Sequence, residues 1–404
     1  MRTVLFIIAI YLLVGCGGSD EQAQTTPDNQ APAVTPNPTP DPPSPDPSSS
    51  CEATTTEVNW DALMNEDCQS LAQYGLFIDP SIPTSSPTSP GLSYQLSTAL
   101  FSNYASKHRF IFIPTNQTIA FDATDTFNMP VGTDTFNMPV GTVLVKTFSL
   151  PFDTQVSGAN NEVLIETRLL IHRDTGWTTL PYIWQDGEAS LQVAGKDIPH
   201  TLNHKGQSQP FDYHVPSRAE CKLCHQTSGD SSQIEPIGLK AHLLNRDVSH
   251  QGSQINQLQL WQQQGLLQGL PQLNQVGKTY DIFDDSAPLT ARAKGYLDVN
   301  CAHCHNPQGF ASISGLRLGF YVDHTSFEYG ICKQPPGWDG GERGLSYDII
   351  PGDGDHSILV YRQELNNAKD RMPPIGRSIA HSDAVALIEK WIDQMEPALG
   401  NCQQ

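Results

Sequence analysis

Basic residues are scarce in this chain of 404 residues, which has 23 lysines and arginines against 43 aspartates and glutamates. The formal net charge is −20, and no stripe of positive charge occurs along the chain. Proteins that bind nucleic acids carry a basic footprint because they neutralise phosphates. The composition therefore argues against nucleic acid as a partner. An acidic surface steers basic partner proteins, although general solubility explains the same charge equally well.

The N-terminus lacks an apolar run long enough to cross a bilayer as a helix. Val4–Val14 is an unbroken apolar run of 11 residues after Arg2, whereas a spanning helix needs about 20 residues. This run has the length of the apolar centre of a secretory signal. The following "LVGC" resembles the lipobox of bacterial lipoproteins, which implies that residues 1–16 are a signal peptide and that Cys16 is acylated. By the same resemblance, Gly17 favours the outer membrane.

Residues 17–50 have almost no apolar side chains to bury, and nine of them are prolines. Such a composition is typical of an extended linker rather than a folded domain. The sequence therefore predicts a disordered tether between a lipid anchor and a body that begins near residue 51, in the periplasm or at the cell surface.

The nine cysteines divide into groups. One ends the lipobox, and four occur in a repeated motif described below. An exported chain meets an oxidising environment, where an even remainder of cysteines indicates disulfides. Four remain, and three pairings of them are possible. Their order along the chain favours Cys51–Cys68 and Cys332–Cys402.

The repeated motif is Cys-x-x-Cys-His, in "ECKLCHQ" and in "NCAHCHN". A zinc site built from two Cys-x-x-Cys halves usually spaces them by about 15–20 residues, but here 76 residues lie between Cys224 and Cys301. A thioredoxin-type pair needs a strand before a helix, and both motifs have flanks with helical patterns. Covalent haem c uses both thiols for the vinyl groups and the histidine as the proximal iron ligand. The sequence therefore predicts two haem c groups, held by Cys221, Cys224, His225, Cys301, Cys304 and His305.

The distal iron ligands differ between the motifs. The second motif, followed by "PGD", "RMPP" and a final amphipathic helix from His381 or Ser382, resembles a class I cytochrome c domain, and the resemblance implies that Met372 is a distal ligand. The first motif has no following methionine before Met372. Its own segment offers His242 and His250, or the iron is five-coordinate. Further candidates from the N-terminal part are Met129, Met138, His200, His204 and His214.

Residues 92–215 have the patterns of short strands. "EVLIETRLLIHR" (162–173) alternates apolar and polar side chains, and similar runs are bounded by Gly, Pro and Asp. We expect an α+β multidomain protein, with an N-terminal antiparallel β-sandwich followed by two mainly α haem c (cytochrome c-like) domains. The expected parts are a β-rich domain at 51–215, a first haem domain at 216–285 closed by a helix at 253–267, and a second haem domain at 286–404.

Several segments together, including "PVGTVLVKTF", "YLDVNCAHCH" and "RMPP", resemble an uncharacterised family of proteobacterial exported dihaem c-type lipoproteins over roughly residues 92–398. The resemblance implies architecture rather than activity. The leading expectation is a membrane-tethered dihaem cytochrome that exchanges electrons with periplasmic redox partner proteins. Two alternatives stay open: a dihaem peroxidase or oxidase with the first haem as its catalytic site, and a ligand-binding β domain with a cytochrome as its electron outlet.

Overall fold

The centre of the computed structural model is an antiparallel sheet of six strands in the order β1-β2-β5-β6-β7-β8. The structure describes residues 49–52, 56–122, 135–226, 234–237 and 239–402. Two-residue turns connect β6 to β7 and β7 to β8, and longer segments connect the other neighbours. The strand bounds are β1 Leu92–Ser93, β2 Ser106–Phe112, β5 Val143–Pro151, β6 Glu162–Arg173, β7 Gly176–Gln185 and β8 Glu188–Leu191.

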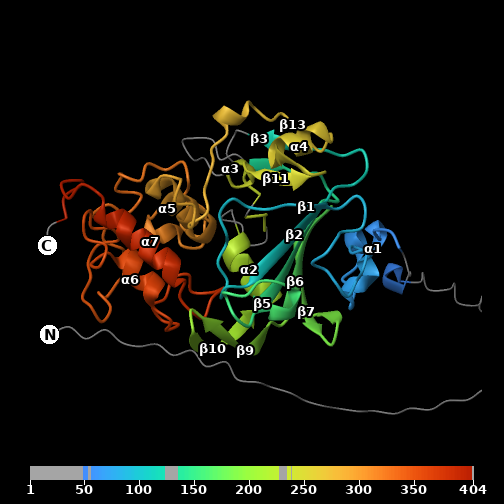
Figure 1. Cartoon of the computed structure of the whole chain (residues 1–404), viewed down its shortest axis with the longest axis horizontal. Coiled ribbons are helices and arrows are strands. Elements are labelled where there is room, and N and C mark those ends of the chain that lie inside the picture. Colours follow the sequence, from blue (N-terminus) through green and yellow to red (C-terminus); the bar gives the residue numbers. More distant parts are fainter. Residues whose placement is uncertain (1–48, 53–55, 123–134, 227–233, 238, 403–404) are drawn as a thin grey trace, which may run out of the picture. The chain divides into compact units, whose positions relative to one another are not determined.

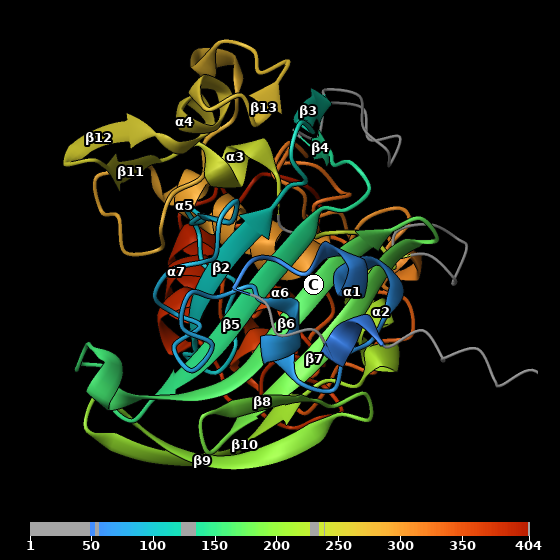
Figure 2. The same ribbon diagram turned by 90° about the vertical axis from the view of Figure 1, so that its right-hand side faces the viewer.

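The two faces of this sheet carry different layers. One face packs against the N-terminal helix α1 (Trp60–Asn65) in a core that includes Phe110, Val145 and Leu169. The helices that bear the Cys-x-x-Cys-His motifs lie on the opposite face (Figures 1 and 2). Because side chains alternate along a strand, the residues next to these core positions point toward the motifs. The sheet is therefore the wall that separates the N-terminal layer from the candidate site.

Three smaller sheets complete the strands. β9 and β10 form a hairpin, β11 and β12 form a second hairpin, and β3 joins β4 and β13 in a three-stranded sheet. β13 pairs in parallel with β3, although it comes about 150 residues later. Their bounds are β3 Ile119–Asp122, β4 Thr135–Asn137, β9 Lys196–His204, β10 Gln207–Val215, β11 Asp247–His250, β12 Ser253–Asn256 and β13 Leu267–Gln268.

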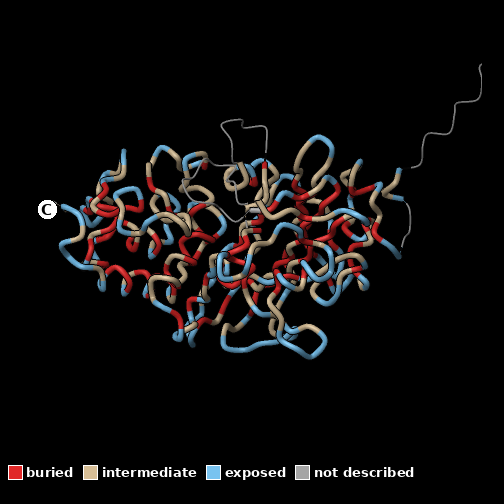
Figure 3. The backbone as a smooth tube through the Cα atoms, turned by 90° about the horizontal axis from the view of Figure 1, so that it is seen from above, coloured by how far each residue is buried: buried red, intermediate tan, exposed pale blue. Residues whose placement is uncertain are grey.

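Most helices of the described chain are short. The exception is the last one, α7 (Ser382–Asp393), which begins where the apolar spacing predicts. It buries Val385, Ile388 and Ile392 along one stripe, in a C-terminal core shared with Trp391. Buried residues occur both in the sheet and around these last helices (Figure 3). The other helices are α2 Arg218–His225, α3 Ala241–Leu244, α4 Gln257–Gln263, α5 Leu289–Leu297 and α6 Ile358–Glu364.

The expected fold class is wrong. Strands outweigh helices, at 26% against 22%, and neither expected haem domain is mainly α. The part at 216–285 contains the β11–β12 hairpin and lends β13 to a sheet of the N-terminal part. The part at 286–404 has three α-helices, of which only α7 is long, joined by long irregular segments. In the described residues the β part is one six-stranded sheet with smaller sheets beside it, not two facing sheets of a sandwich.

The expected closing helix at 253–267 shows the physical reason for part of this error. Its first four residues form β12, and only Gln257–Gln263 are helical. Gln251 and Gly252 both have positive φ angles, of 49° and 80°. Two consecutive residues in this conformation make the two-residue turn that matches the twist of a hairpin. The turn therefore pairs residues 253–256 with β11, and the helical periodicity of this segment is realised only beyond Asn256.

Residues 49–404 belong to one compact unit. The structure contains the disulfides Cys51–Cys68 and Cys332–Cys402, the pairs that chain order favours. Among the described residues, no helix has both the length and the apolar character needed to span a bilayer. The signal peptide, Cys16 and nearly all of the linker at 17–50 lie outside the described residues.

Candidate functional site

The first Cys-x-x-Cys-His motif forms the end of helix α2. Ser217 caps the helix and exchanges hydrogen bonds with Glu220, a capping box that sets the start of the helix. Arg218 holds the helix against the sheet, because its guanidinium donates to the Thr179 carbonyl at 2.9 Å and to Asp67 at 2.6 Å. His225 therefore projects from the last turn of a firmly docked helix.

The second motif follows helix α5 through one turn of π-helix, Asp298–Ala302. Such turns interrupt α-helices mostly at functional sites. The buried side chain of Asn300 fixes this turn to the segment before β2: its amide oxygen accepts from the Phe101 backbone N–H at 2.8 Å, and its amide group donates to Ala99 and Tyr296 carbonyls. The π-turn thus sets the direction in which Cys301 and Cys304 point.

The fold brings the two motifs into contact. The ligand atoms of Cys224, His303 and Cys304 all lie within 4.8 Å of one another. The Cys304 thiol also approaches the Leu223 carbonyl oxygen at 3.7 Å. The four motif cysteines, Cys221, Cys224, Cys301 and Cys304, form no disulfides. Segments separated by 76 residues in the sequence therefore meet at one point.

A buried acidic residue stabilises this meeting of segments. The Asp298 carboxylate, at the start of the π-turn, accepts from the Lys240 ammonium at 2.9 Å and pairs with His242 Nε2 at 3.1 Å. Burial alone would raise the pKa of Asp298, but Lys240 and His242 outweigh it and hold the pKa below its usual range. Asp298 is therefore ionised at neutral pH and links the second motif to the segment that follows the first.

Both motif histidines have the hydrogen bonding of metal ligands. His225 Nδ1 lies 2.6 Å from the Glu235 carbonyl oxygen, and His305 Nδ1 lies 3.1 Å from the Ser314 hydroxyl. No described residue hydrogen bonds to Nε2 of either ring. Ligating histidines usually anchor one ring nitrogen in this way and offer the other to the metal. Burial lowers the pKa of His225 to about 4 and that of His305 to about 4, so both rings are neutral at pH 7.

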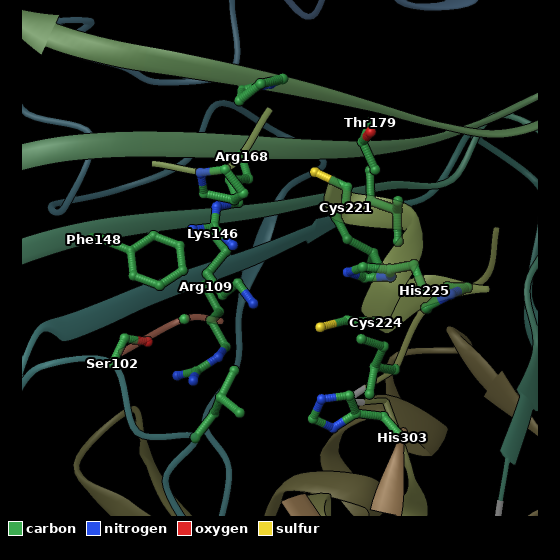
Figure 4. Close-up of a pocket in the computed structure, with 18 of the residues that line it drawn as sticks. Ser102, Arg109, Lys146, Phe148, Arg168, Thr179, Cys221, Cys224, His225 and His303 are labelled. Atoms are coloured by element: carbon green, nitrogen blue, oxygen red, sulfur yellow. The ribbon is translucent and has the colours of Figure 1, made fainter. Parts of the chain in front are cut away.

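A large cavity opens beside the first motif. It contains about 1480 Å³ of space between atoms, counted with its open mouth, and Cys221, Cys224 and His225 line it. Its apolar walls include Leu144, Leu239 and residues of the sheet. Figure 4 shows the motif on one side and the sheet residues Arg109, Lys146, Phe148 and Arg168 on the other.

The cavity at the first motif is therefore a fitting site for haem c: two thiols, a neutral imidazole with an anchored Nδ1, apolar walls and cationic side chains. The second motif has the same ligand types, and His305 is anchored in the same manner. A separate small pocket of about 250 Å³ brings Met372 beside Cys301, with His381 and Arg377. His305 does not line that pocket, and the pocket is too small to hold a porphyrin.

The backbone around Met372 is held by one buried arginine. The Arg377 guanidinium donates to the Met372 carbonyl at 2.7 Å and also to the carbonyls of Arg362 and Gln363. Arg377 is only 4% exposed. The loop that carries Met372 therefore has a defined place beside the second motif, through backbone contacts that the sequence pattern does not reveal.

The histidines expected as distal partners of the first motif lie elsewhere. His242 is bound to Asp298 and stacks on Phe320, and His250 ends strand β11; neither lines the cavity. Of the other described candidates, the cavity lining includes His214 alone. The N-terminal candidates are placed as follows: Met138 in a core cluster, His200 on the Pro151 carbonyl, His204 against Thr154 and Tyr104, and Met129 outside the described residues.

His214 is an unsuitable iron ligand in this arrangement. Its Nδ1 lies 2.6 Å from Asp197 and its Nε2 lies 3.1 Å from Glu220, so both ring nitrogens are occupied. Burial would lower the pKa of His214, but these two carboxylates raise it. Imidazolium has no lone pair for a metal. His303 also lines the cavity, and its Nδ1 is buried without a hydrogen-bond partner among the described residues.

The sequence patterns did not identify His303 or the cavity cations Arg109, Lys146 and Arg168 as site residues. A signal for the cations was present, because each adds a positive charge to a strand that also carries apolar side chains. Such a charge is ordinarily assigned to a solvated face of the sheet. Their common location is visible only after the strands are paired.

No protein-family model matches this chain, and no solved structure matches it. The chain is 30% identical over 132 residues to the ATP phosphoribosyltransferases of Pseudomonas entomophila and of Pseudomonas putida. The match covers 31% of this chain and 57% of those proteins, so the chain spans little more than half the length of the curated relatives it matches. This partial similarity does not place the chain in their family.

Proposed function

We propose that this protein is a dihaem c-type cytochrome, tethered to a bacterial membrane, that transfers electrons between redox partner proteins of the cell envelope. One haem would be attached at Cys221 and Cys224, and the other at Cys301 and Cys304. Bound haem supplies the one-electron iron couple, and the chain supplies attachment, orientation and electrostatics. The proposal agrees with the resemblance to exported dihaem lipoproteins.

The observation that carries the proposal is the contact between the two motifs. Cys224 and Cys304, one attachment residue from each motif, have their sulfur atoms within 4.8 Å of each other. Attachment at these sulfurs places the edges of the two cofactors together, and a short separation favours rapid electron exchange. A chain that used its motifs for two unrelated purposes has no need of this contact.

The remaining residues have supporting roles. His225 and His305 would be the proximal ligands, each with Nε2 offered by an anchored Nδ1. Met372 is proposed as the distal ligand at the second motif, where a thioether raises the reduction potential. Arg377 is a positioning residue for Met372, because it binds the Met372 carbonyl. The first site then has the lower potential, so electrons run from the first motif to the second.

The proposed anchor and partners rest on the N-terminal sequence and on the composition of the chain. Acylated Cys16 would tether the body to the membrane, with the outer membrane favoured, and the proline-rich linker would let the body reach its partners. The net charge of −20 suits partners with basic docking surfaces. The lipid anchor, the linker and the net charge do not depend on the haem geometry.

A second function has a specific observation in its favour. The cavity beside His225 opens on the sheet, and His214, which lines it, has both ring nitrogens occupied by carboxylates. A haem with an open side binds small molecules, as the peroxidase or oxidase alternative requires. The accessible first site then reacts with or senses a ligand, and the second site conducts the electrons.

The deciding experiment is spectroscopy of the purified holoprotein in both oxidation states. Two covalent haems per chain, measured as pyridine haemochrome, are expected. Two low-spin six-coordinate spectra favour electron transfer alone, whereas one high-spin spectrum favours the alternative with an open first site. A chain without covalent haem contradicts both. For the anchor, Cys16→Ala is expected to move the protein from the membrane fraction to the soluble fraction, and continued membrane binding contradicts the lipid anchor.

A further inference from the structure

A row of three cations crosses the cavity face of the sheet. Arg109 on β2 lies directly opposite Lys146 on β5, and Lys146 lies directly opposite Arg168 on β6. Like charges that face each other on neighbouring strands destabilise a sheet. Lys107, one pair further along, adds a fourth cation opposite Phe148. Figure 4 shows the three side chains of the row across the cavity from Cys221, Cys224 and His225.

The described anions near this row do not balance it. The Glu166 carboxylate accepts hydrogen bonds from Nε and Nη2 of Arg168, at 2.7 and 2.5 Å, and from the Tyr213 hydroxyl. The negative charge of Glu166 is therefore paired with Arg168. Glu220 also lines the cavity, but it binds His214 and the cap of helix α2.

The other cations have only weak partners among the described residues. The Lys107 ammonium donates to the Ala105 carbonyl at 2.9 Å, and Arg109 donates to the Lys107 carbonyl at 3.2 Å. Lys146 has no hydrogen bond or ion pair to any described residue, and its ammonium lies 5.3 Å from the centre of the Phe148 ring. Burial, and then Arg168 and Arg109, lower the pKa of Lys146 to about 7.

We propose that Arg109, Lys146 and Arg168 form a binding site for an anionic group, a carboxylate or a small oxyanion, in this cavity. The guanidinium groups provide planar pairs of donors that match such oxygens, and the ammonium provides a point charge between them. The apolar walls suit the body of a ligand whose anionic end lies on the row. An anion bound here attracts all three cations, which offsets their mutual repulsion, and it is an ion-pair partner for Lys146.

Two sources supply this chemistry. The first is the pair of propionates of the haem attached at Cys221 and Cys224, and this source rests on the proposed function. The second is a free anion that enters the cavity from solution, and it does not depend on haem. The two sources predict different results for the same set of variants.

The experiment uses the full-length holoprotein with sodium phosphate and sodium benzoate as probes, in isothermal titration calorimetry. Lys146→Met removes the central charge, Lys146→Arg keeps it, and Lys390→Met removes an exposed lysine of helix α7 as the control. A free-anion site gives saturable binding of at least one probe to the wild-type and control proteins. That binding weakens by about tenfold or more in Lys146→Met, as expected for the loss of a charged hydrogen bond, and returns in Lys146→Arg.

If the propionates occupy the row, neither probe binds to the wild-type protein. The propionate bending band in the resonance Raman spectrum then shifts in Lys146→Met and stays in place in Lys146→Arg and in the control. Both results support the site. Failure of both probes to bind, together with an unchanged propionate band in Lys146→Met, overturns the proposal.

Two further measurements keep these results interpretable. Thermal unfolding checks that each variant is folded, and Arg109→Gln serves as a second test of the row if Lys146→Met fails to accumulate. Pyridine haemochrome reports covalent haem separately. Absence of haem contradicts the proposed function, whereas the phosphate and benzoate titrations still decide whether the row binds an anion.

Discussion

The two Cys-x-x-Cys-His motifs have the same residue pattern but contrasting surroundings. The first, at the end of helix α2, lines a cavity of about 1480 Å³ whose far wall is the cationic sheet face. The second follows a π-turn inside the C-terminal core, and its neighbouring pocket measures about 250 Å³ and contains Met372. Equal ligand sets therefore lie beside one large and one small cavity.

This contrast indicates a division of labour. A metal site with a free position and an open cavity can admit a ligand, whereas a site closed by its own loop is suited to electron exchange alone. The five motif residues determine which cofactor each segment can attach. The surrounding packing determines what else can reach it. The following variants test whether the two motifs differ in this way.

The largest expected effect is on haem content. Replacing Cys221 and Cys224 by alanine, or Cys301 and Cys304 by alanine, is expected to reduce the haem content from two per chain to one, because each pair forms the thioether bonds of one haem. Pyridine haemochrome absorbance per mole of protein measures the change. The control His250→Ala, outside the cavity, keeps both haems. Two haems in either double variant disprove the assignment of that motif.

The second effect concerns access to the two irons. Reduced wild-type protein is expected to bind about one carbon monoxide per two haems, at the open first site, and Met372→Ala is expected to bind about two. The binding stoichiometry from a spectrophotometric titration measures this difference. A companion variant, Met372→His, keeps the site closed and is expected to lower the reduction potential of one haem while leaving the other nearly unchanged.

The outcomes of these two variants separate the alternatives. If Met372→Ala still binds one carbon monoxide and Met372→His moves neither potential, Met372 is not an iron ligand. If the wild-type protein binds none, both sites are closed, and the proposed open side of the first site is wrong.

A third effect concerns the link between the two regions. Asp298→Asn is expected to lower the free energy of unfolding by about 3–5 kcal/mol at pH 7, because it breaks a pair whose carboxylate is buried and leaves the half-buried Lys240 without its charged partner. The folded-state pKa of Asp298 is depressed, so its stabilisation is complete above the unfolded pKa of about 4 and is lost as the pH falls further. The variant should therefore lose less stability than the wild type below about pH 4.

Denaturant unfolding at several pH values measures both parts of this prediction. Asp339→Asn is the matched control, because Asp339 pairs with Lys369 at 3.1 Å while the two side chains are 62% and 73% exposed. An exposed pair contributes about 0–1 kcal/mol. Equal losses in the two variants would show that the Asp298 pair does not hold the regions together.

The smallest expected effect compares the disulfides. Cys332–Cys402 closes 70 residues that follow the second motif and include Met372, and Cys51–Cys68 closes 17 residues in the N-terminal layer. In the chain-entropy model, replacing both cysteines by alanine costs about 4 kcal/mol for the first bridge and about 3 kcal/mol for the second. Denaturant unfolding under non-reducing conditions tests the order, and a larger loss for Cys51–Cys68 contradicts it.

Much of the local structure could be predicted from the sequence. The strand β6 and the helix α7 have regular apolar spacings, and the structure places both where these spacings occur. Even cysteine parity and chain order led to the two disulfide pairs that the structure contains. The assembly of these pieces could not be predicted. The hairpin at β11 and β12 replaced the first four residues of an expected helix, and β13 joined a sheet formed by a distant segment.

The sequence by itself determined the features that a few consecutive residues can carry: the two motifs and the ligand chemistry they offer, the proline-rich linker, and the amphipathic last helix. Tertiary structure alone decided that Cys224 meets Cys304, that Arg377 holds Met372, and that three cations form one row. The physical reason is that strand register and helix docking join residues far apart in the chain, and no local period records those pairings.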